Sequence, residues 1–249
     1  MCLIGWNWQP GTAQPLLLVA NRDEYYSRPT LAMHWWDDAE VLAGKDLTGG
    51  GTWLGVTRSG RMAALTNYRE PGNFRADAPS RGTLVADFLA GKATSVEYLN
   101  AVNGHAKHYN PFNLLVFDGA RLMGLESRRS RVFALEPGIG GVSNADFQSP
   151  WPKLERLQAG LARANEMPAG SQEHLLWSLL SDRTYAPDNE LPHTGVPPER
   201  ERDLSAAFIA TPDYGTRAST LLRLRSQGLR IEERRYDPNG LAGSSRFTL

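Results

Sequence analysis

The first two dozen residues constrain the fold of this chain more than any other stretch. Two apolar runs, residues 2–8 and 16–20, enclose a turn cluster at residues 9–12 that contains Pro-Gly. Two apolar runs joined by such a turn are typical of a β-hairpin. A loop centred near residue 12 places position i opposite position 24 − i. The pattern therefore predicts that Cys2 lies opposite Arg22, to within one residue.

Cys2 is the only cysteine of the 249-residue chain. The thiolate is the nucleophilic form of cysteine, and a neighbouring Arg lowers the pKa of a thiol. Removal of Met1, which a small second residue permits, leaves a free α-amine on Cys2, and such an amine can serve as general base for its own side chain. Cys2 is then both nucleophile and base. The alternative is that Cys2 is a small hydrophobic residue on a buried strand, as many free cysteines are.

Composition excludes several classes of protein. Hydrophobic residues make up 41% and charged residues 22%, as in ordinary soluble domains, and 27 Lys and Arg balance 27 Asp and Glu. This balance argues against nucleic acid as the main partner. The lone cysteine excludes an intramolecular disulfide framework and fits a reducing compartment. The N-terminus lacks the pattern of a secretory signal, and no apolar run approaches the roughly 18 residues that span a bilayer. We expect a cytoplasmic protein without a transmembrane segment.

Apolar periodicity separates blocks of strands from blocks of helices. Strands are predicted at residues 52–57, 61–67, 112–117, 121–126, 131–135, 140–143, 206–210, 218–225, 229–236 and 246–249. Helices are predicted at residues 80–90, after a capping box at residues 94–97, and at residues 151–165 and 171–180. Residues 25–51 are predicted to be irregular. Residues 184–203 are predicted to form a long loop, either a pocket lid or a mobile surface insertion. Segregated strands and helices indicate an α+β fold in a single domain.

Three polar residues near predicted strand ends are further candidates for a site. Asn67 ends one strand and Asn144 follows another, and a side-chain amide can donate to a developing oxyanion. Arg217 lies in the turn before residues 218–225, where a guanidinium can bind a substrate carboxylate or brace the surroundings of Cys2. Taken alone, the two Asn residues are also typical of turns and helix caps. Glycines 49–51 lack the residues of a phosphate loop and are predicted to permit a tight turn or a close backbone approach.

A series of short motifs, in one order, covers nearly the whole chain. They are Met-Cys at the start, Asn-Arg-Asp-Glu at 21–24 with Arg-Pro at 28–29, Gly-Gly-Thr-Trp-Leu-Gly at 50–55, Leu-Thr-Asn-Tyr-Arg at 65–69, Ser-Arg-Gly at 80–82, Phe-Asn-Leu at 112–114, Ser-Asn at 143–144, Pro-Trp-Pro-Lys at 150–153 and Tyr-Gly-Thr-Arg at 214–217. On these motifs the chain resembles the NRDE family, also called the transport and Golgi organisation 2 family. That family is similar to N-terminal-nucleophile (Ntn) hydrolases of the choloylglycine hydrolase and penicillin V acylase type. The resemblance implies a four-layer αββα sandwich over residues 1–249, two antiparallel sheets flanked by helical pairs.

The resemblance also implies a set of site residues. The hydrolases use a starting Cys, an Arg and an Asp after the second strand, two Asn and a late Arg, and the matching residues here are Cys2, Arg22, Asp23, Asn67, Asn144 and Arg217. In the hydrolases two residues separate the Arg from the Asp, whereas Arg22 and Asp23 are adjacent. Adjacent strand residues point to opposite faces, so both reach Cys2 only through a bulge or a strand end. Glu24 is the alternative partner of Arg22.

Two functions from different classes follow. The first is hydrolysis or transfer of an acyl group at an amide-like C–N bond of a small-molecule substrate, and it requires no cofactor. Cys2 attacks with its α-amine as base, Asp23 orients the amine, the two Asn hold the oxyanion, and the two Arg stabilise charge on thiolate and substrate. The second is a non-catalytic intracellular carrier or chaperone of haem, or of a lipid or acyl-coenzyme A ligand. Cys2 and His34 are the candidate haem ligands. No metal site is predicted.

Overall fold

The structure, a computed structural model, describes residues 2–37, 39–168 and 170–249. The chain divides into two compact units. Unit 1 is built from residues 1–27 and 137–248, and unit 2 from residues 28–136. Unit 1 therefore combines the two ends of the chain.

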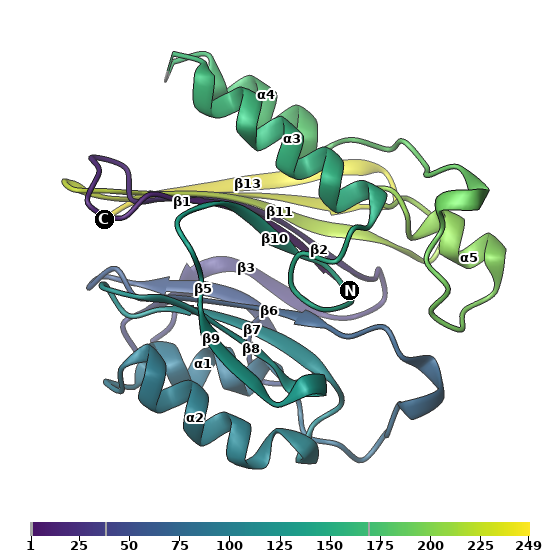
Figure 1. Cartoon of the computed structure of the whole chain (residues 1–249), viewed down its shortest axis with the longest axis horizontal. Coiled ribbons are helices and arrows are strands. Elements are labelled where there is room, and N and C mark those ends of the chain that lie inside the picture. Colours follow the sequence, from purple (N-terminus) through teal and green to yellow (C-terminus); the bar gives the residue numbers. More distant parts are fainter. Residues whose placement is uncertain (1, 38, 169) are drawn as a thin grey trace. The chain divides into compact units, whose positions relative to one another are not determined.

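The sheet of unit 1 has six antiparallel strands in the order β10-β1-β2-β11-β12-β13 (Figure 1). Their bounds are β1 (Cys2–Trp8), β2 (Leu16–Tyr25), β10 (Gly138–Val142), β11 (Tyr214–Arg225), β12 (Gly228–Asp237) and β13 (Gly240–Thr248). Strand β1 lies inside this sheet, between β2 and β10. All seven of its residues are buried, as its nearly continuous apolar sequence predicts.

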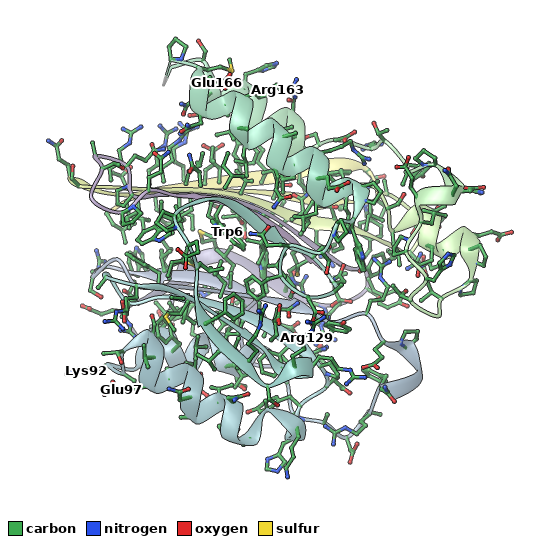
Figure 2. All side chains as sticks on the ribbon, viewed as in Figure 1. Trp6, Lys92, Glu97, Arg129, Arg163 and Glu166 are labelled. Carbon is green, nitrogen blue, oxygen red and sulfur yellow. The ribbon has the colours of Figure 1, made fainter. Side chains whose placement is uncertain are left out.

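Two helices, α3 (Pro152–Glu166) and α4 (Gln172–Leu180), pack on one face of this sheet. A leucine stripe on α3, Leu154, Leu157 and Leu161, forms a buried core with Leu3 and Val19 of the hairpin. The opposite side of α3 is polar, and Figure 2 shows Arg163 and Glu166 near the end of this helix, where both are exposed. The predicted helical stripe therefore faces the sheet, as expected for an amphipathic helix.

Unit 2 contains a seven-stranded antiparallel sheet in which every strand pairs with its neighbour in sequence. Its strands are β3 (Thr30–Trp35), β4 (Val41–Asp46), β5 (Leu54–Thr57), β6 (Met62–Asn67), β7 (Phe112–Phe117), β8 (Leu122–Glu126) and β9 (Arg131–Ala134). Helices α1 (Gly82–Ala90) and α2 (Ser95–His105) pack on this sheet. The predicted capping box begins α2, since Thr94 and Glu97 bond each other's backbone N–H groups.

The glycines at residues 49–51 permit a close backbone approach, as predicted. Gly50 has φ +74°, and a Cβ on Gly51 would lie 2.2 Å from the carbonyl carbon of Gly82 at the start of α1. The N–H of Thr52 donates to the carbonyl of Gly82 over 3.1 Å. Only a residue without a side chain fits at position 51.

Several predicted boundaries were wrong. Residues 25–51, predicted to be irregular, contain β3 and β4, whose pairing is interrupted by a register shift between Leu31 and His34. Residues 206–210, predicted as a strand, form no strand and make only an isolated bridge at Ala210. The C-terminal strand β13 is nine residues long because it pairs along most of β12. Arg217 lies within β11 and not in a turn before it.

The segment at residues 184–203 contains two short helical pieces, η4 (Asp188–Glu190) and α5 (Pro198–Asp203). Within the described residues, no helix is both long and apolar enough to cross a membrane. The α+β class, the two antiparallel sheets and the pair of helices on each sheet are confirmed.

Candidate functional site

The opening hairpin positions the candidate nucleophile. Cys2 pairs with Arg22, and the pairs continue through Leu3 with Asn21 to Trp8 with Leu16. The loop closes where the N–H of Gln9 donates to the carbonyl of Pro15 over 2.8 Å. The predicted register is confirmed at every pair, because the apolar pattern and the turn select the same alignment.

Burial dominates the chemistry of the Cys2 thiol. The residue is 5% exposed, and desolvation raises the pKa of its thiol above the ordinary value. The carboxylates of Asp23 and Glu24 raise it further, while the guanidinium of Arg22 acts in the opposite direction. The lowering effect of Arg22 has the direction expected from the sequence, and the net direction is upward because burial is the larger effect. Desolvation of the thiolate outweighs the attraction of the two positive charges that lower this pKa, the N-terminal ammonium group and Arg22.

Arg22, which pairs with Cys2, and the two charged residues that follow it alternate between the two faces of β2. Arg22 Nη2 lies 3.8 Å from Glu24 Oε2. Glu24, the alternative to Asp23 as the partner of Arg22, is therefore an ion-pair partner of Arg22. Asp23 is 1% exposed, and its Oδ1 accepts a 2.7 Å hydrogen bond from the hydroxyl of Thr216. Thr216 is fully buried on β11. The carboxylate of Asp23 is thereby fixed from a strand almost two hundred residues away in sequence.

A bulge lies beside these residues, in β11 and not in β2. Thr216 pairs with Asp23 and Ala218 with Arg22, so Arg217 is the extra residue. Its Nη1 donates to the carbonyls of Tyr25 over 2.8 Å and Tyr26 over 3.1 Å. Burial lowers the pKa of Arg217, and the nearby charge of Arg22 lowers it further. Arg217 thus braces the end of β2, and its two predicted roles, binding a substrate carboxylate and bracing the surroundings of Cys2, stay predictions.

Asn144 reaches the same place from β10. It is fully buried, two residues beyond Val142, which pairs with Ile4. The hydroxyl of Ser143 lies 3.2 Å from the carbonyl oxygen of Cys2 and 3.3 Å from Asn144 Oδ1, so its single hydrogen can be donated to either acceptor. Ser143 therefore connects the backbone of the candidate nucleophile to the candidate oxyanion donor.

Asn67 is the one predicted site residue that belongs to unit 2. It is the last residue of β6 and pairs with Phe112, and its side chain is half-buried. Its oxyanion role stays a prediction. The structure brings the other five predicted residues together at one end of the unit 1 sheet: Cys2, Arg22, Asp23, Asn144 and Arg217.

Sequence reasoning missed three residues of this cluster. Thr216 and Ser143 hold Asp23 and Asn144, as described above. Tyr214 is the third, because burial raises the pKa of its hydroxyl well above the ordinary value, and Asp23, Glu24 and Cys2 raise it further. All three residues lie in the quoted motifs at residues 143–144 and 214–217. The available signal was their place in those motifs, one or two residues from a predicted site residue.

The described residues offer no metal centre, since no group of three or more His, Cys, Asp or Glu side chains among them is arranged to hold an ion. The cluster instead combines a buried thiol, a fixed carboxylate, an amide and two guanidinium groups. Such a set can activate a nucleophile and stabilise an anion.

Comparison with solved structures identifies the fold. The Caenorhabditis elegans N-acylethanolamine-hydrolyzing acid amidase ortholog is similar with a TM-score of 0.52 and 12% identity, covering 89% of this chain and 92% of that chain. This similarity confirms the predicted Ntn-hydrolase type of fold. At this identity it describes the backbone alone.

Comparison of sequences identifies the family. The Bos taurus Transport and Golgi organization protein 2 homolog is 36% identical over 251 residues, with 92% of this chain and 90% of that protein covered. The Homo sapiens homolog is 34% identical over 253 residues with the same coverage. The family model for Transport and Golgi organisation 2 matches residues 1–238. The chain therefore belongs to the Transport and Golgi organisation 2 family.

Proposed function

We propose that this protein hydrolyses or transfers an acyl group at an amide-like C–N bond of a small-molecule substrate, with Cys2 as the nucleophile after removal of Met1. The observation that carries the proposal is the register of the hairpin, which sets Cys2 against Arg22 with Asp23 next in the strand. The fold supports it, because a structurally similar protein is described as an amidase. The lone cysteine of the chain supports a reducing compartment, the cytoplasm, as its location.

In the proposed reaction the α-amine of Cys2 takes the thiol proton as sulfur attacks the substrate carbonyl carbon. A C–S bond forms, and the carbonyl oxygen becomes an oxyanion that accepts a hydrogen bond from Asn144; Asn67 is the second donor that the family resemblance implies. Collapse breaks the C–N bond, and the proton passes from the α-amine to the leaving amine. Water then attacks the thioester, the C–S bond breaks, and a carboxylic acid and the free thiol result. A second amine in place of water gives acyl transfer.

The charged residues around Cys2 fit these reaction steps. Asp23, fixed by Thr216, orients the protonated α-amine. Arg22 is the cation nearest in register to the sulfur and stabilises the thiolate that burial disfavours. Arg217 stabilises negative charge on the substrate from the bulge. The thiol stays protonated until the amine accepts its proton, which limits side reactions of a buried nucleophile.

Intact mass spectrometry tests the proposal directly. The mature chain without Met1 is incubated with a series of N-acyl p-nitroanilides, and an acyl adduct is mapped to Cys2. We expect the adduct in the native chain and none in Cys2→Ser. Asn144→Ala and Asn67→Ala are expected to slow acylation by about 10²–10³-fold each. Asn239→Ala, an exposed turn substitution, is the matched control. A chain that lacks Met1 and forms no adduct with any substrate rules out the mechanism, and a neutral Asn67→Ala removes that residue from it.

The carrier hypothesis has one observation in its favour. Cys2 is buried with a raised thiol pKa, and structural buried cysteines of this kind are inert. Burial also disfavours the thiolate form that binds haem iron, so Cys2 fits that role poorly. His34 fits better, since its Nδ1 lies 2.7 Å from the carbonyl of Ala32 and Nε2 is left for a ligand. A Soret band that appears on adding haem and is lost in His34→Ala supports the carrier, while an acyl adduct on Cys2 supports the enzyme.

A further inference from the structure

The segment between α4 and β11 folds around a pocket of its own. The N–H of Ala186 donates to the hydroxyl of Ser205 over 2.9 Å and joins the two ends of the segment. Asp188 and Arg202 form a two-point ion pair across it, in which Nε lies 2.9 Å from Oδ1. Loops with joined ends are compact and frequently functional. The predicted long loop is therefore a closed substructure.

The pocket has a volume of about 310 Å³. Its lining comes entirely from residues 188–201: Asp188, Leu191, Pro192, His193, Gly195, Val196, Pro198 and Glu201. We call it the 188–201 pocket. Its volume is at the lower end of the roughly 300–1,000 Å³ typical of small-molecule sites.

The walls of the 188–201 pocket favour an apolar occupant. Leu191, Pro192, Val196 and Pro198 present aliphatic surface, which gains free energy when an apolar group displaces water from it. Both carboxylates of the lining are already engaged within the segment. Asp188 pairs with Arg202, and Glu201 accepts bonds from the N–H and the hydroxyl of Thr194. Apart from the imidazole of His193, the lining contains no aromatic ring, and its remaining apolar surface is aliphatic, which fits an aliphatic chain.

The wall of this pocket is joined to the Cys2 cluster within unit 1. Helix α5 supplies Pro198 and Glu201 to the lining, and its Arg200 lies 4.7 Å from the ring centroid of Tyr214. Tyr214 pairs with Tyr25 at the end of β2, and two residues further along β11 lies Thr216, the partner of Asp23. Figure 1 shows α5 beyond one end of this sheet. The pocket therefore lies toward the end of β2 that carries the candidate site.

We propose that the 188–201 pocket receives the aliphatic acyl chain of the substrate on which Cys2 acts. This rests on the proposed function and adds a substrate class, amides of medium-length straight-chain acids. The carbonyl is then at Cys2, the chain runs past Tyr214 and Arg200, and its end is enclosed by Val196 and its neighbours. Short acyl groups such as acetyl do not reach the pocket and gain nothing from it.

A binding experiment on the full chain tests the pocket without turnover. Decanoate, below its critical micelle concentration, is titrated calorimetrically into Cys2→Ser and into the same chain carrying Val196→Trp, which fills the pocket. We expect decanoate affinity to fall about tenfold or more in Val196→Trp, and acetate to show no binding. Ser178→Trp, an exposed position on α4, is the matched control and should bind decanoate normally. Val196→Thr, which keeps the branched shape of this half-buried residue and adds a hydroxyl, is the second variant and should weaken binding in the same direction.

The outcomes separate this inference from the proposed function. Equal decanoate affinity in the two Val196 variants and the control overturns the pocket assignment, and so does a failure of the Cys2→Ser chain to bind decanoate. In the native chain, acylation of Cys2 should be faster with decanoyl than with acetyl p-nitroanilide, and Val196→Trp should abolish that difference. Acylation that is independent of chain length leaves the proposed function standing and overturns the pocket. Absence of any adduct defeats the proposed function, while decanoate binding still decides the pocket.

Discussion

The hydroxyl of Thr216 makes two buried hydrogen bonds. It donates to Asp23 Oδ1 over 2.7 Å and accepts from the N–H of Ile209 over 2.9 Å. Thr216→Val removes both hydrogen bonds. Asp23 Oδ1 and the N–H of Ile209 then each lose one buried partner. We expect a loss of about 1–3 kcal/mol in the free energy of unfolding. Urea denaturation measures it, and Thr216→Ser should recover most of the loss. A Val variant as stable as the native chain would contradict this role.

The raised thiol pKa of Cys2 predicts a dependence of stability on pH. An unfolded thiol ionises near its ordinary pKa of about 8.5, whereas the folded thiol keeps its proton to a higher pH. Above that value the unfolded state binds fewer protons than the folded state, so this stabilising contribution is present below pH 8.5 and declines as pH rises. We expect the stability difference between the native chain and Cys2→Ala to shrink between pH 7.5 and 9.5. Urea midpoints at the two pH values measure it, and a constant difference would exclude a raised pKa.

At the scale of residues, the sequence alone predicts contacts between strands that are adjacent in the chain. It does not predict contacts made by residues from distant segments. The pairing of Cys2 with Arg22 follows from counting residues outward along both strands from the loop centre near residue 12. The net direction of the thiol pKa could not be predicted, because it depends on burial by elements far along the chain. Thr216 and Ser143 were missed for the same reason, since their partners come from other strands.

At the scale of elements, the contact between Gly51 and the start of α1 gives a sharp prediction. A Cβ at position 51 would lie 2.2 Å from backbone that cannot move independently of the helix. We expect Gly51→Ala to lower the free energy of unfolding by about 1–3 kcal/mol or more. Gly104→Ala, within α2 and with nothing within 4 Å of its Cβ position, is the matched control. The control should be neutral or stabilising by about 0.4–1 kcal/mol, and equal effects in thermal unfolding would contradict the argument.

Elements with a local signal were predicted and elements without one were not. The capping box at Thr94 and the turn signals of the hairpins are local, and α2 and the hairpins follow them. Strands β3 and β4 pair across a register shift and include Gly44, Lys45 and Asp46, residues that strands disfavour. Residues 206–209 are apolar and buried, as strand residues often are. However, the N–H of Phe208 donates to the backbone carbonyl of Asp182, and the N–H of Ile209 donates to the hydroxyl of Thr216. A buried apolar segment that makes no ladder of strand-to-strand hydrogen bonds therefore has the same sequence pattern as a strand.

At the scale of the whole chain, the family motifs predicted the type of fold that the structural comparison confirms. Periodicity alone predicted the α+β class but not the order of strands. The neighbours of β1 and β2 include β10 and β11, which begin at Gly138 and Tyr214. No local pattern relates segments separated by more than a hundred residues. Such pairings depend on the fold of the whole chain. The resemblance to a family of known fold implies them, whereas the pattern of apolar residues in one segment does not.

The position of β1 between β2 and the edge strand β10 has a consequence for the order in which the protein is synthesised and folds. Strand β1 is synthesised well before β10, which is not complete until Val142 has been added. At about 5–20 residues per second this takes roughly 7–30 s. During that interval the N-terminus is an open chain that a methionine aminopeptidase can reach, and after it Cys2 is buried. Under the proposed function, we therefore expect the removal of Met1 to take place during synthesis. A chain that folds with Met1 still attached should resist the aminopeptidase in the test tube, and denaturation should restore cleavage.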